Sequence, residues 1–156
     1  MRKLRGGLNF TGGGQRALFV SRAVAPLETV EQQRLFAWLF ATERLYPEDS
    51  PVRESLGWIH SVPNGAHVHK GTALKLVAEG LKSGILDISC DEPRGPWAGL
   101  RIEMKRRGKK PSPNQLRYMK YLDRIRIRRE VCYTWQAAAR VIIDYLSLTL
   151  HAPIYE

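Results

Sequence analysis

Apolar and polar residues recur along the chain with spacings that predict both helices and strands. From about Leu27 to just before Pro47, apolar side chains are spaced as on one face of a helix, at Leu35, Trp38, Leu39 and Leu45. Residues 46–54 contain two prolines and are expected to form a loop. A second helix is predicted from about Thr72, with Gly80 in its C-terminal cap.

The second half of the chain predicts two more helices and most of a sheet. Ser112, Pro113 and Gln115 have the pattern of a capping box with proline in the first turn, which predicts a third helix from this point. A closing amphipathic helix is predicted over residues 136–148. Extended segments are predicted at residues 58–62, 86–90, 100–105 and 125–133. This order of elements predicts an α/β protein with a mixed central sheet flanked by helices.

The composition fits one folded domain that follows a basic arm. The chain has 156 residues, of which 44% are hydrophobic, so a core is available. Residues 1–25 hold five glycines, five bases and no acid, and we expect a flexible arm there, followed by the domain at residues 26–156. No apolar run is long enough to span a membrane, and no secretory signal is apparent. The two cysteines cannot form a disulfide framework, so we expect a cytoplasmic protein.

The positive charge of the chain is concentrated in one segment. The whole chain carries 25 basic and 15 acidic residues, a net charge of +10. Residues 105–129 contain eleven of the bases and a single acid, Asp123, so this segment accounts for 11 − 1 = +10. A basic block of this kind favours a polyanionic partner such as nucleic acid, although a solvated basic face would have the same composition.

Two ionisable residues share one face of the strand predicted at residues 100–105. Alternation along the strand directs Leu100, Ile102 and Met104 to the core, so Glu103 and Lys105 emerge together on the other face. A carboxylate beside an amine suits a site that handles phosphates, because the carboxylate holds a hard cation while the amine orients water or stabilises negative charge. The alternative is an exposed ion pair of little energetic value.

Three segments around this strand have the order and spacing of a known nuclease core. They are Gly84-Ile85-Leu86-Asp87, Gly99-Leu100-Arg101-Ile102-Glu103-Met104-Lys105 and Ser112-Pro113-Asn114-Gln115. Together they resemble the PD-(D/E)xK nuclease superfamily and, more closely, the virus-type replication-repair nuclease (VRR-NUC) domain. The resemblance also includes Glu28, Gln32 and Trp38, the Pro63-Asn64-Gly65 turn, the helix at residues 73–80, and Cys132-Tyr133-Thr134-Trp135 with the last helix. One departure is Leu86, where the superfamily usually has proline before the metal-binding aspartate.

The resemblance implies a restriction-endonuclease-like fold and a set of site residues. It implies that Glu28, Asp87, Glu103 and the carbonyl of Met104 bind Mg²⁺, with Mn²⁺ also accepted. It further implies that Lys105 is the catalytic lysine and that Gln115 supports Asp87, Glu103 and Lys105 in catalysis. The basic residues next to this set are expected to grip DNA phosphates: Arg106, Arg107, Lys109, Lys110, Arg117 and Lys120.

The activity implied is that of a Mg²⁺-dependent deoxyribonuclease. Stand-alone members of the family in phages and bacteria are homodimers that cut branched DNA such as four-way junctions. The resemblance therefore implies a structure-selective endonuclease that forms a homodimer. It also implies a bacterial or phage-infected host cell. Two other functions stay open. One is a non-catalytic DNA-binding accessory protein on the same fold, and the other is a sequence-specific restriction-type nuclease.

Several residues have two interpretations at this point. Glu31 lies one helical turn from Glu28 and is its rival as a ligand, and Gln115 serves the capping box as well as it serves the site. His67 and His69 are interpreted as loop residues, since no cysteine or histidine group completes a zinc set. Trp97 stays open as a contact residue, whereas four others are assigned to the core: Trp38, Cys90, Cys132 and Trp135.

Overall fold

The computed structural model describes residues 26–63 and 70–147. Its elements, in chain order, are α1 (Glu28–Glu43), α2 (Pro51–Gly57), β1 (His60–Ser61), α3 (Lys70–Ala78), β2 (Ile88–Cys90), β3 (Gly99–Met104), α4 (Pro113–Arg124), β4 (Ile127–Cys132) and α5 (Trp135–Leu146). No helix within these ranges is long and apolar enough to cross a membrane.

The strands form one mixed sheet in the order β1-β2-β3-β4. β1 and β3 are both antiparallel to β2, whereas β3 and β4 are parallel. The parallel pair requires a crossover connection, and α4 provides it. In the register of this pair Glu103 is opposite Val131. The predicted mixed central sheet flanked by helices is therefore confirmed.

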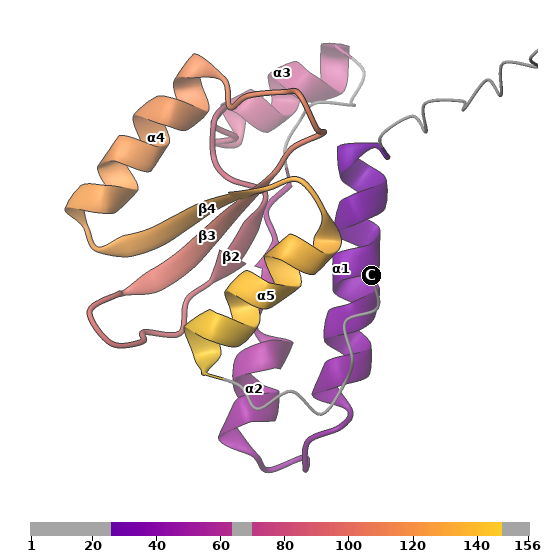
Figure 1. Ribbon diagram of the computed structural model, residues 1–156. Coiled ribbons are helices and arrows are strands. Elements are labelled where there is room, and N and C mark those ends of the chain that lie inside the picture. The colour runs from indigo at the N-terminus through magenta and orange to yellow at the C-terminus, as the bar shows by residue number, and fades with distance from the viewer. Residues whose placement is uncertain (1–25, 64–69, 148–156) are drawn as a thin grey trace, which may run out of the picture.

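Helices cover the two faces of the sheet unequally (Figure 1). α1, α2 and α5 pack on one face around a large apolar cluster, whose members include Leu35, Leu56, Ile88, Ile102 and Ile142. α4 covers the other face over a smaller cluster of Leu86, Met119 and Leu122. Each fully buried leucine side chain stabilises the fold by about 1.5–3 kcal/mol, so both faces contribute to stability. The predicted core positions Trp38, Cys90 and Cys132 are buried and Trp135 is half-buried.

The predicted loop at residues 46–54 is wrong in its second half, because α2 begins there. Pro51 occupies the first turn of this helix, where its missing N–H costs nothing. Ser50 caps the helix by accepting a hydrogen bond from the backbone N–H of Arg53 at 3.1 Å. The strand predicted at residues 58–62 is reduced to His60–Ser61.

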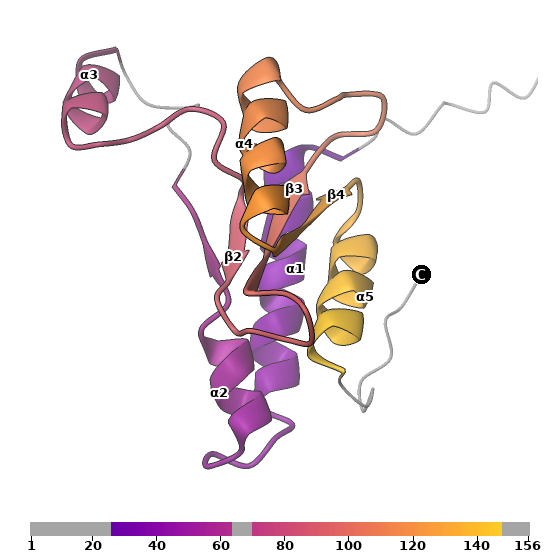
Figure 2. The same cartoon turned by 90° about the vertical axis from the view of Figure 1, so that its left-hand side faces the viewer.

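The other expected elements are present with shifted ends. α3 begins at Lys70 rather than Thr72, and Gly80 lies beyond its end with a φ of +100°. Figure 2 shows α3 set apart from the sheet and the other helices. Its side chains Leu74 and Val77 are 73% and 61% exposed. The turn residues Asn64 and Gly65, His67 and His69, and the predicted arm at residues 1–25 lie outside the described residues.

Candidate active site

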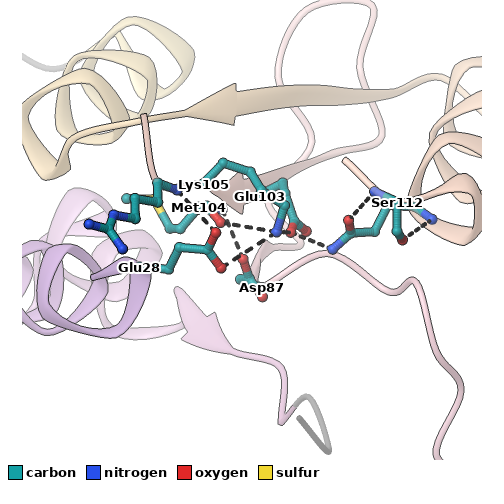
Figure 3. Close-up of polar contacts among 8 residues, drawn as sticks. Glu28, Asp87, Glu103, Met104, Lys105 and Ser112 are labelled. Carbon is teal, nitrogen blue, oxygen red and sulfur yellow. Dashed lines mark hydrogen bonds and ion pairs between the residues drawn. The ribbon is translucent and has the colours of Figure 1, made fainter. Parts of the chain in front are cut away.

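The site forms where the C-terminal end of β3 meets the first turns of α1 and α4 (Figure 3). β3 supplies Glu103 and is followed by Lys105, and Asp87 precedes the neighbouring strand β2. α1 supplies Glu28 from its first turn. Three segments that are far apart in the sequence thus bring three carboxyl groups and one amine together.

Strand alternation determines which β3 side chains face the site. Leu100, Ile102 and Met104 pack in the large apolar cluster, as predicted. Glu103 and Lys105 lie on the α4 side of the sheet, but the alternative of an exposed pair is wrong, because Glu103 is 0% exposed. A fully buried carboxyl group is costly unless it is paired or holds a cation, which makes this position a candidate for chemistry.

Glu103 has one satisfied carboxylate oxygen and one unsatisfied one. Its Oε1 accepts hydrogen bonds from Lys105 Nζ and from Gln115 Nε2. Its Oε2 is buried and has no hydrogen-bond partner in the part of the chain that the structure describes. Burial raises the pKa of Glu103 to about 7, and the charges of Asp87 and Glu28 add to this effect against the opposing influence of Lys105.

The ammonium group of Lys105 lies among the carboxylates. Its Nζ is hydrogen-bonded to Glu103, lies 3.6 Å from Glu28 Oε2 and approaches the carbonyl oxygen of Met104 at 3.4 Å. Burial lowers the pKa of Lys105, but the hydrogen bond to Glu103 and the nearby negative charges outweigh burial, so the pKa is raised overall. Lys105 therefore stays protonated at neutral pH.

The structure separates the roles of the two rival glutamates of α1. Glu28 faces the site, where its Oε1 accepts a hydrogen bond from the backbone N–H of Arg106 at 3.0 Å. Glu31 is 4% exposed and faces α5, where its Oε2 accepts a hydrogen bond from the backbone N–H of Trp135 at 2.7 Å. Glu31 thereby satisfies a free donor at the start of α5 and contributes no oxygen to the site.

Asp87 is fixed by a backbone contact from the next strand. Its Oδ2 accepts a hydrogen bond from the N–H of Met104 at 2.8 Å, which holds Asp87 beside Glu103. Leu86, where the superfamily usually has proline, is 0% exposed and packs under α4 with Met119 and Leu122. Leu86 therefore adds to the core, and Asp87 after it contacts the backbone of β3 next to Glu103.

Gln115 makes contacts that fit both of the interpretations that the sequence left open. Its backbone N–H donates to Ser112 Oγ at 3.3 Å and its Oε1 accepts from the Ser112 N–H at 2.7 Å, which completes the capping box. Its side-chain nitrogen at the same time donates to Glu103. The first turn of α4 is thus tied to the buried carboxylate.

A second contact, between the chain before β2 and the first turn of α4, was not predicted from the sequence. Ser83 Oγ accepts a hydrogen bond from Asn114 Nδ2 at 2.8 Å. Gly84 has a φ of +92°, and a Cβ atom at this position would lie 2.6 Å from the backbone carbon of Asn114. Gly84 lets the chain that leads to Asp87 pass directly against α4. The glycine before the aspartate was the available signal, but its partner is 30 residues away in the sequence.

The donor set fits a hard divalent cation, although the ligands are not arranged around one. Glu28, Asp87, Glu103 and the carbonyl of Met104 supply only oxygen atoms, which Mg²⁺ prefers. The buried, unsatisfied Oε2 of Glu103 is the observation that favours a missing positive partner. Within residues 26–63 and 70–147, no three histidine, cysteine, aspartate or glutamate side chains are grouped closely enough to hold a metal. The ammonium of Lys105 lies between Glu28 and Glu103 instead.

The predicted DNA-contacting residues lie on two neighbouring surfaces. Arg106, Arg107, Lys109 and Lys110 belong to the loop between β3 and α4, and Arg117 and Lys120 are exposed on α4. Trp97 is 37% exposed in the turn before β3, at the end of that strand opposite the site. The structure therefore does not bring Trp97 into the candidate site.

The mixed sheet and its flanking helices define a restriction-endonuclease-like α/β fold. A solved structure described as a VRR_NUC domain protein matches the chain with a TM-score of 0.62 and 25% sequence identity. The match covers 80% of this chain and 92% of that chain. The resemblance to the VRR-NUC domain is thus confirmed, and the chain has the fold of this nuclease superfamily. No protein-family model and no curated protein sequence matches the chain.

Proposed function

We propose that the protein is a Mg²⁺-dependent deoxyribonuclease that hydrolyses phosphodiester bonds in branched DNA. The observation that carries this proposal is the fully buried Glu103, which shares one oxygen with Lys105 and Gln115 and leaves the other without a partner. A structural ion pair would not need an unsatisfied buried oxygen, whereas a cation-binding carboxylate does.

The side chains of the site divide the chemical tasks between them. Glu28, Asp87, Glu103 and the Met104 carbonyl would hold Mg²⁺, which when bound supplies Lewis-acid catalysis to the phosphodiester. Lys105 stays protonated because its pKa is raised, so its role is to stabilise the negative charge that develops on the phosphate and to orient the attacking water. Gln115 keeps Glu103 in position through its amide nitrogen.

The basic loop after Lys105 is suited to hold the strand being cut. Its four cations, Arg106, Arg107, Lys109 and Lys110, have no ion-pair partner among the described residues. A groove of about 390 Å³ adjoins this loop, and Arg107, Gly108 and Tyr133 contribute to its walls. Because counterions are released at each phosphate contact, binding to DNA should weaken steeply as salt is added.

A homodimer would provide the second cut that a branched substrate needs. The described part of one chain holds one such cluster, so cuts on two opposing strands require two copies. α3 offers the contact surface, because Leu74 and Val77 expose most of their apolar area to solvent. A groove of about 520 Å³ lies beside them, and its walls include Val62, Leu76 and Ile85.

Cleavage of a panel of DNA structures tests the activity. Linear duplex, flap, splayed and four-way substrates are incubated with and without Mg²⁺, using wild type, Lys105→Ala and, as a control, Arg44→Ala. Arg44 is an exposed residue at the end of α1. We expect Mg²⁺-dependent cleavage of branched substrates by wild type and the control. Lys105→Ala should lose cleavage and keep DNA binding nearly intact.

The same panel separates the competing functions. Undiminished Mg²⁺-dependent cleavage by Lys105→Ala would refute the role given to this lysine. DNA binding without cleavage under every condition would favour an accessory DNA-binding protein. Cuts that map to one short duplex sequence would favour a restriction-type nuclease.

A further inference from the structure

In the folded chain, three cations of the basic block at residues 105–129 are paired with carboxylates and the others are not. Lys105 belongs to the site. Arg128 pairs with Glu130 at 3.0 Å and with Asp144 at 2.7 Å. Arg129 makes two parallel 3.0 Å contacts with Asp123, the only acid of the block. Among the described residues, the other eight cations have no carboxylate partner: the four of the loop after β3, and Arg117, Lys120, Arg124 and Arg126.

Three of these cations without a carboxylate partner form a stripe along α4, and the first of them, Arg117, donates a hydrogen bond to Asn114 Oδ1 at 2.7 Å. Arg117, Lys120 and Arg124 follow one another at intervals of three and four residues, which places them on one side of the helix, and all three are exposed. With a rise of about 1.5 Å per residue, the stripe is about 10 Å long. The acid that would neutralise it, Asp123, is already engaged by Arg129.

An aromatic platform lies within the same stripe. The guanidinium of Arg124 lies over the ring of Tyr121, 5.7 Å from its centroid. The ring of Tyr121 in turn stacks on Tyr118, with centroids 6.2 Å apart and an interplanar angle of 22°. Tyr118 packs against the buried cluster under α4, so the platform is supported from below. Tyr121 itself is 45% exposed.

The stripe leads directly away from the candidate site. The first turn of α4 is bound to Glu103 through Gln115, and the helix runs from there to Arg124. A strand that has its phosphate at the site and follows the outer side of α4 would meet Arg117 first and Arg124 last. Phosphates match exposed guanidinium and ammonium groups, and an unpaired base matches an aromatic ring or a guanidinium plane.

We infer that the outer side of α4 is a second nucleic-acid contact surface that selects substrates with unpaired bases. This inference rests on the proposed nuclease function and deepens it. Arg117, Lys120 and Arg124 would bind the backbone beyond the cut, and the Tyr121–Arg124 platform would stack a base that is exposed at a branch point. A linear duplex keeps its bases stacked on one another, so it would use the cations and leave the platform unused.

Binding measurements without metal test the backbone contacts. Fluorescence anisotropy in EDTA gives the affinity for a splayed DNA and for a blunt duplex over a range of salt concentrations. The double variant Lys120→Gln with Arg124→Gln should reduce the slope of log K against log salt by about 1.8, since each lost phosphate contact removes about 0.9. Arg44→Gln, a charge change of the same kind at the exposed residue that follows α1, should leave the slope unchanged. An unchanged slope in the double variant would overturn the inference.

Substitution of the platform tests the selectivity. Tyr121→Ala should weaken binding to the splayed DNA by about tenfold and leave the blunt duplex unaffected, whereas Tyr121→Phe should bind both as wild type does. Circular dichroism and the thermal midpoint check that Tyr121→Ala is folded, and Tyr121→Leu, which keeps a large apolar side chain without a ring and without a change of charge, serves as the second variant if it is not. Equal losses for both DNAs, or no loss in either variant, would overturn the inference and favour a different partner for α4.

The outcome is independent of cleavage. Selective binding that depends on Tyr121 would support the inference even if the chain cut no substrate, and in that case only the nuclease proposal would fail. Cleavage of branched DNA that is indifferent to the α4 variants would refute the inference and leave the nuclease proposal in place.

Discussion

Glu103 has no contact with bulk water, so its charge state links folding to pH. Its pKa is about 7 in the folded chain against an ordinary value of 4.5. A raised pKa stabilises the folded state at pH values below 4.5, and this stabilisation is lost as the pH rises through about 7. The size of the effect is about 3 kcal/mol at most.

As the pH rises from 4.5 to about 7, the thermal midpoint of the metal-free wild type should therefore decrease relative to that of Glu103→Gln, which cannot titrate at this position. Added Mg²⁺ or Mn²⁺ should raise the midpoint of wild type most at pH 8, where the carboxylate is ionised, and should have little effect on the variant. Parallel pH curves for the two proteins, or equal metal shifts, would contradict the ligand role of Glu103.

Substitutions of the two glutamates of α1 should affect different properties, metal binding for Glu28 and stability for Glu31. Glu28→Gln removes a half-exposed site carboxylate, so we expect loss of the metal-induced thermal shift with little change in stability. Glu31→Gln weakens a buried, charged hydrogen bond to the start of α5 and should lower the free energy of unfolding by about 1.5–3 kcal/mol. Urea denaturation with and without Mg²⁺ measures both. A metal shift lost in Glu31→Gln but kept in Glu28→Gln would reverse the assignment.

At the scale of elements, the site depends on how closely α4 approaches the chain before β2. Gly84→Ala would place a methyl group against the backbone of Asn114, whereas Gly80→Ala, at a similar positive φ, meets nothing within 4 Å. Backbone strain alone costs about 1–2 kcal/mol at either position, so Gly80→Ala should show only this cost. Gly84→Ala should lose more stability and should also lose metal binding, because α4 carries Gln115. Equal losses of the thermal midpoint in Gly84→Ala and Gly80→Ala would contradict the close contact between Gly84 and α4.

The sequence predicts individual elements better than the way they meet. Alternation along β3 placed Glu103 and Lys105 on one face, and the capping pattern located the start of α4, because both signals are local. The burial of Glu103 was not predictable, since it depends on α4 covering that face. The choice between Glu28 and Glu31 was equally inaccessible, because one helical turn separates them and only the position of α5 distinguishes them. Two prolines concealed α2, although Pro51 is compatible with a first helical turn.

At the scale of the whole molecule, the proposed homodimer depends on the apolar side of α3. Replacing Leu74 and Val77 together with glutamate should convert a dimer to a monomer, because buried charges would face each other across the contact. Light scattering after size-exclusion chromatography measures the mass. Leu45→Glu, at a 53% exposed position beyond α1, is the control and should stay dimeric. A dimer that persists in the α3 variant would assign the contact to another surface.

The ion pairs of Arg128 and Arg129 also determine how the sheet ends. In the part of the chain that the structure describes, β4 is the last strand of the sheet and one of its edges has no strand beside it. An open edge of this kind is a template on which another chain can add a strand and begin to aggregate. β4 carries three consecutive charged residues, Arg128, Arg129 and Glu130, and their partners Asp123 and Asp144 hold two of these side chains in place. Arg128 and Arg129 are unavailable to DNA because of their ion pairs. At the edge of β4 the same two charges hinder a neighbouring molecule from adding a strand to the sheet.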